Sequence, residues 1–123
     1  MVKNILITGG AGYIGSHISE ILVKNKKNVF IVDNLSTGYS KLINKNARFF
    51  RANINNKNII KAIIINNKID SVIHLAASLI IGMGEKYPKF YYKNNVLGTK
   101  NLLTACLNTT VKNFIFSSTA AVY

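Results

Sequence analysis

The sequence contains a single cysteine and no apolar run of membrane-spanning length. Because Cys106 has no partner in the chain, an intrachain disulfide is excluded, and this composition predicts a reducing, cytoplasmic environment. The longest apolar runs fall far short of the ~20 residues that cross a bilayer, so no membrane partner is expected. A strand-like run begins at Val2 without a preceding apolar leader, and no signal peptide is predicted.

Acidic residues are also scarce, since four Asp and Glu stand against 16 Lys and Arg, for a net charge of +12. The basic residues are scattered from Lys3 to Lys112, and no basic segment of five or more residues exists. A nucleic-acid partner is therefore not predicted, and the charge is interpreted as a contribution to solubility and electrostatic steering. His74 lies on an apolar strand without a cluster of Cys, Asp or Glu ligands, so it is interpreted as structural and no metal site is predicted.

The most informative segment present is the glycine-rich run at residues 5–15. An apolar strand there breaks into a turn with Gly9, Gly12 and Gly15 and then opens a helix, a geometry that suits a pyrophosphate. A second apolar strand at residues 29–32 ends in Asp33, which follows Gly15 by 18 positions. This spacing is close to the ~20 residues expected for a carboxylate that binds adenosine ribose hydroxyls. The combination predicts a dinucleotide site that favours NAD over NADP.

Strand and helix patterns alternate along the rest of the chain. Helices are expected at residues 13–25, 58–66 and 88–107, and strands at residues 47–52, 70–76 and 112–117. The first helix carries its predicted apolar face at Ile14, Ile18, Ile21 and Leu22. This alternation predicts an α/β fold with a doubly wound parallel sheet of Rossmann type and strand order 3-2-1-4-5. The chain stops at Tyr123, just after an apolar strand-like run, so residues 1–123 are expected to be a truncated domain, incomplete at its C-terminus.

Several motifs together resemble one enzyme family. Residues 8–17 resemble the fingerprint of the extended short-chain dehydrogenase/reductases. The segments at residues 33–38, 74–77, 91–99 and 114–123 narrow the resemblance to the UDP-glucose 4-epimerases. The resemblance covers the whole chain in order. It implies an isomerase in which bound NAD is a transient hydride acceptor, a UDP-sugar substrate, a homodimer when full-length, and a substrate domain that would follow residue 123.

The resemblance also implies roles for individual residues. The implied cofactor-binding residues are Gly9, Gly12, Tyr13, Ile14, Gly15, Asp33, Asn34, Ser36, Asn53, Ile54, Ala76, Ala77, Asn94 and Ser117. Thr119 is the implied catalytic residue, whose hydroxyl assists proton transfer at the sugar. The catalytic Tyr-x-x-x-Lys pair of the family does not occur within residues 1–123, so this chain alone is expected to be inactive.

This sequence departs from the family pattern at four positions, and alternatives remain open. Asn53 replaces the usual Asp that contacts the adenine amino group, and its amide keeps an acceptor oxygen for that contact. Leu79, Met83 and Gly84 replace a Lys and a Glu-Ser pair found in some members. Asp33 could instead cap a loop, and Asn53 could be an ordinary turn residue. Another NAD-dependent nucleotide-sugar epimerase or dehydratase, or a non-catalytic NAD-binding fragment, remains an alternative function.

Overall fold

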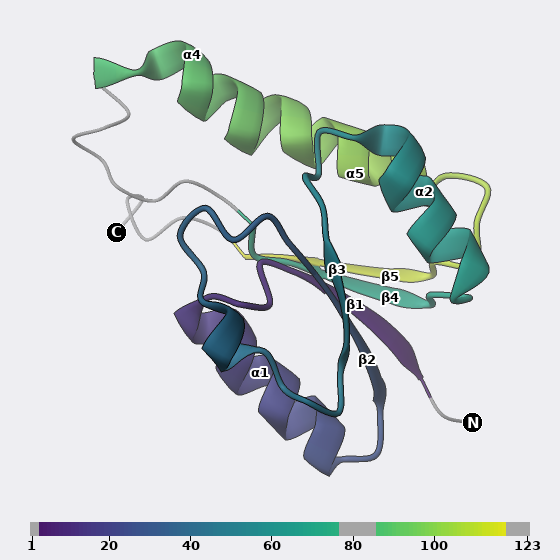
Figure 1. The fold of residues 1–123 in the computed structure, drawn as a ribbon. Helices are drawn as coiled ribbons and strands as arrows, with labels where there is room; N and C mark the ends of the chain where they lie inside the picture. Colours follow the sequence, from purple (N-terminus) through teal and green to yellow (C-terminus); the bar gives the residue numbers. More distant parts are fainter. Residues whose placement is uncertain (1–2, 77–85, 118–123) are drawn as a thin grey trace.

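A computed structural model describes residues 3–76 and 86–117 and shows a five-stranded sheet with helices on both faces (Figure 1). The strands are β1 (Asn4–Thr8), β2 (Asn28–Asp33), β3 (Arg48–Arg51), β4 (Ser71–His74) and β5 (Asn113–Phe116). They lie in the order β3-β2-β1-β4-β5, and all four neighbouring pairs are parallel. The predicted doubly wound sheet and its strand order are confirmed. The order reverses between β1 and β4, which makes the carboxyl ends of these two strands the switch point of the sheet.

The helices divide between the two faces of the sheet. Helix α1 (Tyr13–Lys24) covers one face, and α2 (Lys57–Asn66) with α5 (Gly98–Cys106) covers the other (Figure 1). A short 3-10 segment, η1 (Ser40–Leu42), follows β2. Helix α2 buries Ile60, Ile63 and Ile64, so its helical periodicity prevails over the strand preference of isoleucine.

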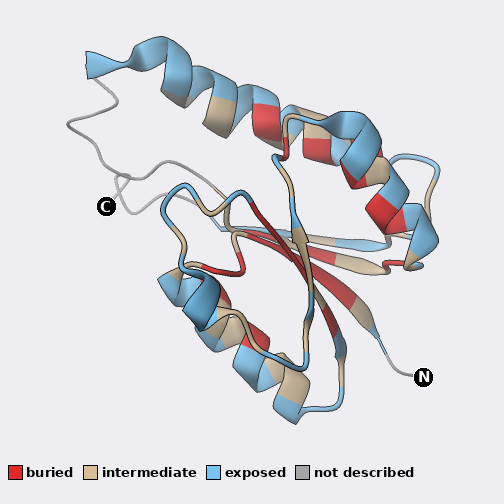
Figure 2. Cartoon of the chain, viewed as in Figure 1, coloured by how far each residue is buried: buried red, intermediate tan, exposed pale blue. Residues whose placement is uncertain are grey.

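The core lies in two layers, one on each side of the sheet. Alternate strand residues point to opposite faces. Leu6, Val32 and Val72 therefore pack toward α2 and α5, whereas Ile5, Ile7, Val29 and Ile31 pack in the layer that α1 covers. Figure 2 shows the buried positions concentrated in the central strands and on the helix sides that face them.

The buried face of α1 differs from the predicted one. Ile18 and Leu22 pack against the sheet as expected, but Ile14 is 56% exposed and Ile21 is 59% exposed. The fully buried positions of α1 are instead Gly15 and Ser19. The small residues Gly15 and Ser19 let the helix lie close to the strands. The side of α1 that carries them faces the sheet, and Ile14 and Ile21 are left exposed to solvent.

The helix predicted at residues 88–107 is present but is not uniformly α-helical. It consists of α4 (Pro88–Tyr91), a π-helical segment η2 (Tyr92–Leu97) and α5, which follow one another without a break in Figure 1. Pro88 occupies the first turn, where its missing N–H costs nothing, as the sequence predicted. The wider π turns were not predicted, because periodicity and propensity do not distinguish them from α-helix over six residues.

His74 links the two central strands to the long helix. It pairs in register with Thr8 on β1, and the Thr8 hydroxyl lies 2.6 Å from His74 Nδ1. On its other side, His74 Nε2 lies 2.8 Å from the hydroxyl of Thr99 on α5. The Thr99 hydroxyl donates its one hydrogen to the Asn95 carbonyl oxygen, so it accepts from Nε2–H. Nδ1 is therefore the unprotonated nitrogen and accepts from Thr8.

The same network opposes protonation of His74. The Thr8 hydroxyl oxygen already accepts the backbone N–H groups of Leu75 and Ala76, at 3.2 and 3.3 Å, so it is poorly placed to accept a further N–H from an imidazolium. The side chain is 2% exposed, and burial lowers the pKa of His74 from 6.5 to about 4. These contacts support the structural role that the sequence suggested for this histidine.

His74 should make stability depend on pH between about 6.5 and 4. The unfolded chain protonates the imidazole first, so stability is fully present above pH 6.5 and falls as the pH drops toward the folded pKa of about 4. The loss should approach about 3 kcal/mol, which is the pKa difference expressed as free energy. Urea unfolding at several pH values in this window measures it.

Two variants separate this contribution from those of other groups. His74→Gln should show a shallower decline in stability than the unmodified protein over the same pH window, whatever its stability at neutral pH. His17→Gln, at an exposed position on α1, should keep the full decline. An unchanged slope in His74→Gln would assign the acid sensitivity to other residues.

Candidate cofactor-binding cleft

A cleft of about 840 Å³ opens at the carboxyl ends of the strands. The structure brings most of the predicted cofactor-binding residues to its walls. These are Gly9, Gly12, Tyr13, Ile14, Gly15, Asp33, Asn34, Ser36, Asn53, Ile54, Ala76, Asn94 and Ser117. Ala77 and Thr119 lie outside the described residues. The predicted residues come from six separate chain segments, so a shared cleft is a consequence of the topology and not of sequence proximity.

The three glycines predicted to bind the pyrophosphate, Gly9 and Gly12 in the loop after β1 and Gly15 in α1, meet different constraints. Gly9 has a φ of +78°, and a Cβ there would lie 2.9 Å from the backbone nitrogen of Ala76. A Cβ on Gly15 would overlap the Gly9 carbonyl oxygen. A Cβ on Gly12 would approach only that same oxygen, at 3.3 Å, and otherwise meets open space. The folded chain therefore requires Gly9 and Gly15, whereas a Cβ at Gly12 meets one tight contact that a small shift of the Gly9 carbonyl would relieve.

The N-terminus of α1 is suited to bind an anion. Gly12 is its N-cap residue, no side chain caps the first turn, and no acidic residue lies in that turn. The first backbone N–H groups of a helix have no partner within the helix, and the helix dipole places partial positive charge beside them. Gly12, Tyr13 and Ile14 all line the cleft. A phosphate group at this end would satisfy the uncapped N–H groups.

Asp33 lies in the cleft at the end of β2 and joins two loops. Its Oδ2 accepts the Ala11 N–H of the glycine loop at 3.0 Å, and its Oδ1 accepts the Leu35 N–H at 2.8 Å. The loop-capping role considered from the sequence is thus present in the structure. Each carboxylate oxygen has a further lone pair, so Asp33 can hold its loops and still accept hydroxyl groups from a ligand.

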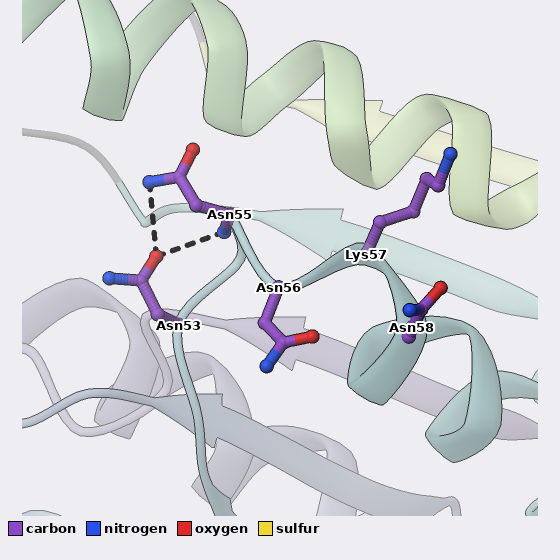
Figure 3. Close-up of a pocket in the computed structure, with 5 residues that line it drawn as sticks. All are labelled: Asn53, Asn55, Asn56, Lys57 and Asn58. Atoms are coloured by element: carbon purple, nitrogen blue, oxygen red, sulfur yellow. Dashed lines mark hydrogen bonds between the residues drawn. The ribbon is translucent and has the colours of Figure 1, made fainter.

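Asn53 lies between the cleft and a second, shallower hollow of about 650 Å³. Asn55, Asn56, Lys57 and Asn58 complete this hollow at the start of α2 (Figure 3). The Asn53 Oδ1 accepts the backbone N–H of Asn55 at 2.9 Å and the Asn55 side-chain amide at 3.1 Å. The oxygen that the sequence analysis assigned to adenine therefore already has two partners within the loop.

Sequence analysis missed several residues that line the cleft. They include Thr37 and Gly38 after β2, Leu75 after β4, and Asn95, Thr99 and Phe116 from the opposite wall. His74 also lines the cleft, although it was predicted only as a structural residue. The signal that could have found most of them is position, because they follow strand ends or flank residues already singled out. Asn95 directly follows Asn94, and Thr99 ends the motif at residues 91–99, so position was a signal for both.

Two further features of the described residues bear on the site. Within residues 3–76 and 86–117, no three His, Cys, Asp or Glu side chains gather in an arrangement that could hold a metal ion. In the same part of the chain, no helix combines the length and apolar character needed to span a bilayer.

Comparison with known proteins identifies the family. Residues 5–123 match the model of the NAD dependent epimerase/dehydratase family. The UDP-glucose 4-epimerase of Halalkalibacterium halodurans is 42% identical over 119 residues, which cover 97% of this chain and 35% of that protein. The chain thus spans about a third of the length of this relative.

Solved structures agree with this assignment. The UDP-glucose 4-epimerase of Thermotoga maritima with UDP-glucose has a TM-score of 0.91 at 39% identity, over 94% of this chain and 37% of that one. The UDP-glucose 4-epimerase of Brucella ovis in complex with NAD has a TM-score of 0.93 at 38% identity, over 99% of this chain and 37% of that one. The chain belongs to the NAD dependent epimerase/dehydratase family.

Proposed function

We propose that the cleft binds NAD and that this chain forms the NAD-binding part of a UDP-glucose 4-epimerase, which interconverts UDP-glucose and UDP-galactose. Family membership and the 4-epimerase relatives support this proposal. The observation that carries it is the uncapped N-terminus of α1 at the cleft, where Gly12 is the N-cap residue and is less constrained by the fold than Gly9 and Gly15. A ligand that must approach the backbone closely explains a glycine at this position.

The topology suggests which residues would bind each part of the cofactor. The N-terminus of α1 lies at the switch point and would hold the pyrophosphate. Asp33 would accept the adenosine ribose hydroxyls on the β2 side of that point. Ala76, Asn94 and Ser117 line the β4 and β5 side of the cleft and would border the nicotinamide half.

Bound NAD would supply a reversible hydride acceptor for the sugar C4 carbon. The chain's own contribution would be to bind the cofactor and orient it between the two halves of the sheet. Thr119, assigned from the sequence, would hydrogen-bond the reacting sugar hydroxyl. Because residues 1–123 contain no Tyr-x-x-x-Lys pair, we assign them cofactor binding and not the main proton transfer, so residues 1–123 alone would not turn over substrate.

We also propose that the protein forms a homodimer through the helix made of α4, η2 and α5. Apolar side chains along this helix are exposed, including Tyr92 at 57%, Val96 at 49% and Leu103 at 46%. Such a surface commonly marks a protein–protein contact. Sedimentation of the purified protein should show a dimer, and a monomer over a range of concentrations would contradict this assignment.

Alanine at two glycines should separate ligand binding from folding. Gly12→Ala should lower the free energy of unfolding by no more than about 1 kcal/mol, because its backbone is extended and its Cβ would meet a single tight contact, with the Gly9 carbonyl oxygen at 3.3 Å. The same change should weaken NAD binding at least about tenfold, by crowding the phosphate position. Gly15→Ala should destabilise the fold by about 2–3 kcal/mol, because its Cβ meets backbone.

Urea unfolding and calorimetric titration with NAD measure these two effects. NAD binding by Gly12→Ala equal to that of the unmodified protein would remove the main support for a pyrophosphate at this loop.

The choice between NAD and NADP should depend on Asp33. Its carboxylate would repel a 2′-phosphate, so the protein should bind NAD more tightly than NADP. Asp33→Asn should lower the ratio of the two affinities at least about tenfold, because the repulsion and one acceptor are both lost. A ratio is the suitable measure, since any loosening of the loops held by Asp33 affects both cofactors.

Glu20→Gln is the control, because it removes one negative charge from an exposed ion pair with Lys24 on α1. It should leave the ratio unchanged. Tighter binding of NADP than NAD by the unmodified protein would overturn the assignment of Asp33 to the ribose.

A further inference from the structure

The adenine end of the proposed site can be located from the cleft. If the pyrophosphate lies at α1 and the ribose at Asp33, the base lies farther from the switch point, toward β3. The cleft continues in this direction over Ala52, Asn53 and Ile54, which follow β3. Asn53 is the amide side chain on this part of the wall, so it borders the base. This step rests on the proposed function.

The direction of the Asn53 amide is set by its neighbours. The backbone N–H of Asn55 can only donate, so the atom of Asn53 that faces it at 2.9 Å must be the oxygen. The Asn55 side-chain amide donates to the same oxygen at 3.1 Å. Figure 3 shows the Asn53 nitrogen on the side away from Asn55. Asn53 therefore presents N–H donors outward, and its acceptor serves the loop.

The loop that fixes this orientation is itself anchored. The Asn56 N–H donates to the Asn53 carbonyl oxygen at 2.9 Å and closes the turn. Asn101 on α5 donates to the Asn55 carbonyl oxygen at 3.2 Å. Ile54, the residue between Asn53 and Asn55, is 3% exposed and packs into the hydrophobic core. Rotating the Asn53 amide by half a turn would place its NH₂ group against the N–H of Asn55, so two donors would face each other. The anchored loop cannot move to separate them.

We infer that Asn53 is a specificity-determining residue that presents a hydrogen-bond donor to the purine, so that the site does not select the 6-amino group of adenine. That amino group is itself a donor and finds no acceptor at Asn53. A 6-oxopurine such as hypoxanthine offers an acceptor oxygen at the same ring position. An aspartate at position 53 would form the same turn with one oxygen and present the other as an acceptor, so one atom decides the preference.

Binding of NAD and of nicotinamide hypoxanthine dinucleotide by calorimetric titration tests this inference. The unmodified protein should bind the two dinucleotides with affinities within about threefold of each other. Asn53→Asp should shift the ratio of affinities about tenfold toward NAD, which is the change expected when an unpaired donor gains an acceptor. Because both ligands carry the same phosphates, the added negative charge cancels in the ratio.

Asn56→Asp is the matched control. Asn56 caps α2 by accepting the Ile59 N–H at 3.3 Å, a role that a carboxylate also fills, and Asn56 does not line the main cleft. This variant carries the same added charge in the same loop and should leave the ratio unchanged. Thermal unfolding of both variants establishes that they are folded.

The possible failures are distinguishable. A ratio that is the same in Asn53→Asp and the unmodified protein, or an unmodified protein that already prefers NAD about tenfold, overturns the inference while the proposed function stands. If neither dinucleotide binds the folded protein, the proposed function fails and the inference fails with it.

Discussion

The rest of the structure depends on two close backbone contacts, one between Gly9 and the chain after β4 and one between Gly15 and the Gly9 carbonyl. The first turn of α1 lies against the Gly9 carbonyl, and the Gly9 turn lies against the backbone after β4. Neither approach leaves room for a Cβ. These contacts set the helix N-terminus at the carboxyl ends of β1 and β4, where the order of the sheet reverses. The anion-binding end of the helix and the open end of the cleft therefore coincide.

Two polar side chains, Asp33 and His74, connect the segments that form the walls of the cleft. Asp33 ties the loop after β2 to the glycine loop through the Ala11 and Leu35 N–H groups. His74 ties the end of β1 to the start of α5 through two threonine hydroxyls. One carboxylate and one neutral imidazole thus connect the segments that parallel strands and crossovers bring together. Both lie in the cleft wall, so the residues that hold the fold also shape the site.

The scarcity of acidic residues makes their placement informative. Among the described residues, Glu20 pairs with Lys24 on the surface of α1, whereas Asp33 and Asp70 accept backbone N–H groups. Asp70 accepts the Asn4 N–H at 2.7 Å and joins the start of β1 to that of β4. The buried Asp33 and the half-buried Asp70 therefore both connect separate segments of the chain. Asparagine side chains accept backbone N–H groups at other positions and add no charge. Asn53 caps a turn in this way, and Asn56 caps the start of α2.

The sequence by itself determined the alternation of strands and helices, the strand order and the residues that follow strand ends. These features depend on local periodicity and on glycine spacing, and both can be recognised in short segments of the sequence. Only the tertiary structure decided which side of α1 is buried, where the long helix becomes π-helical, and which way the Asn53 amide points. The buried side of α1 depends on packing against the sheet, and the Asn53 amide is oriented by Asn55 in a turn that Asn101 anchors from 46 residues away. Local pattern states which side chains can face a site, but the direction of a hydrogen bond depends on the neighbour that packing places beside it.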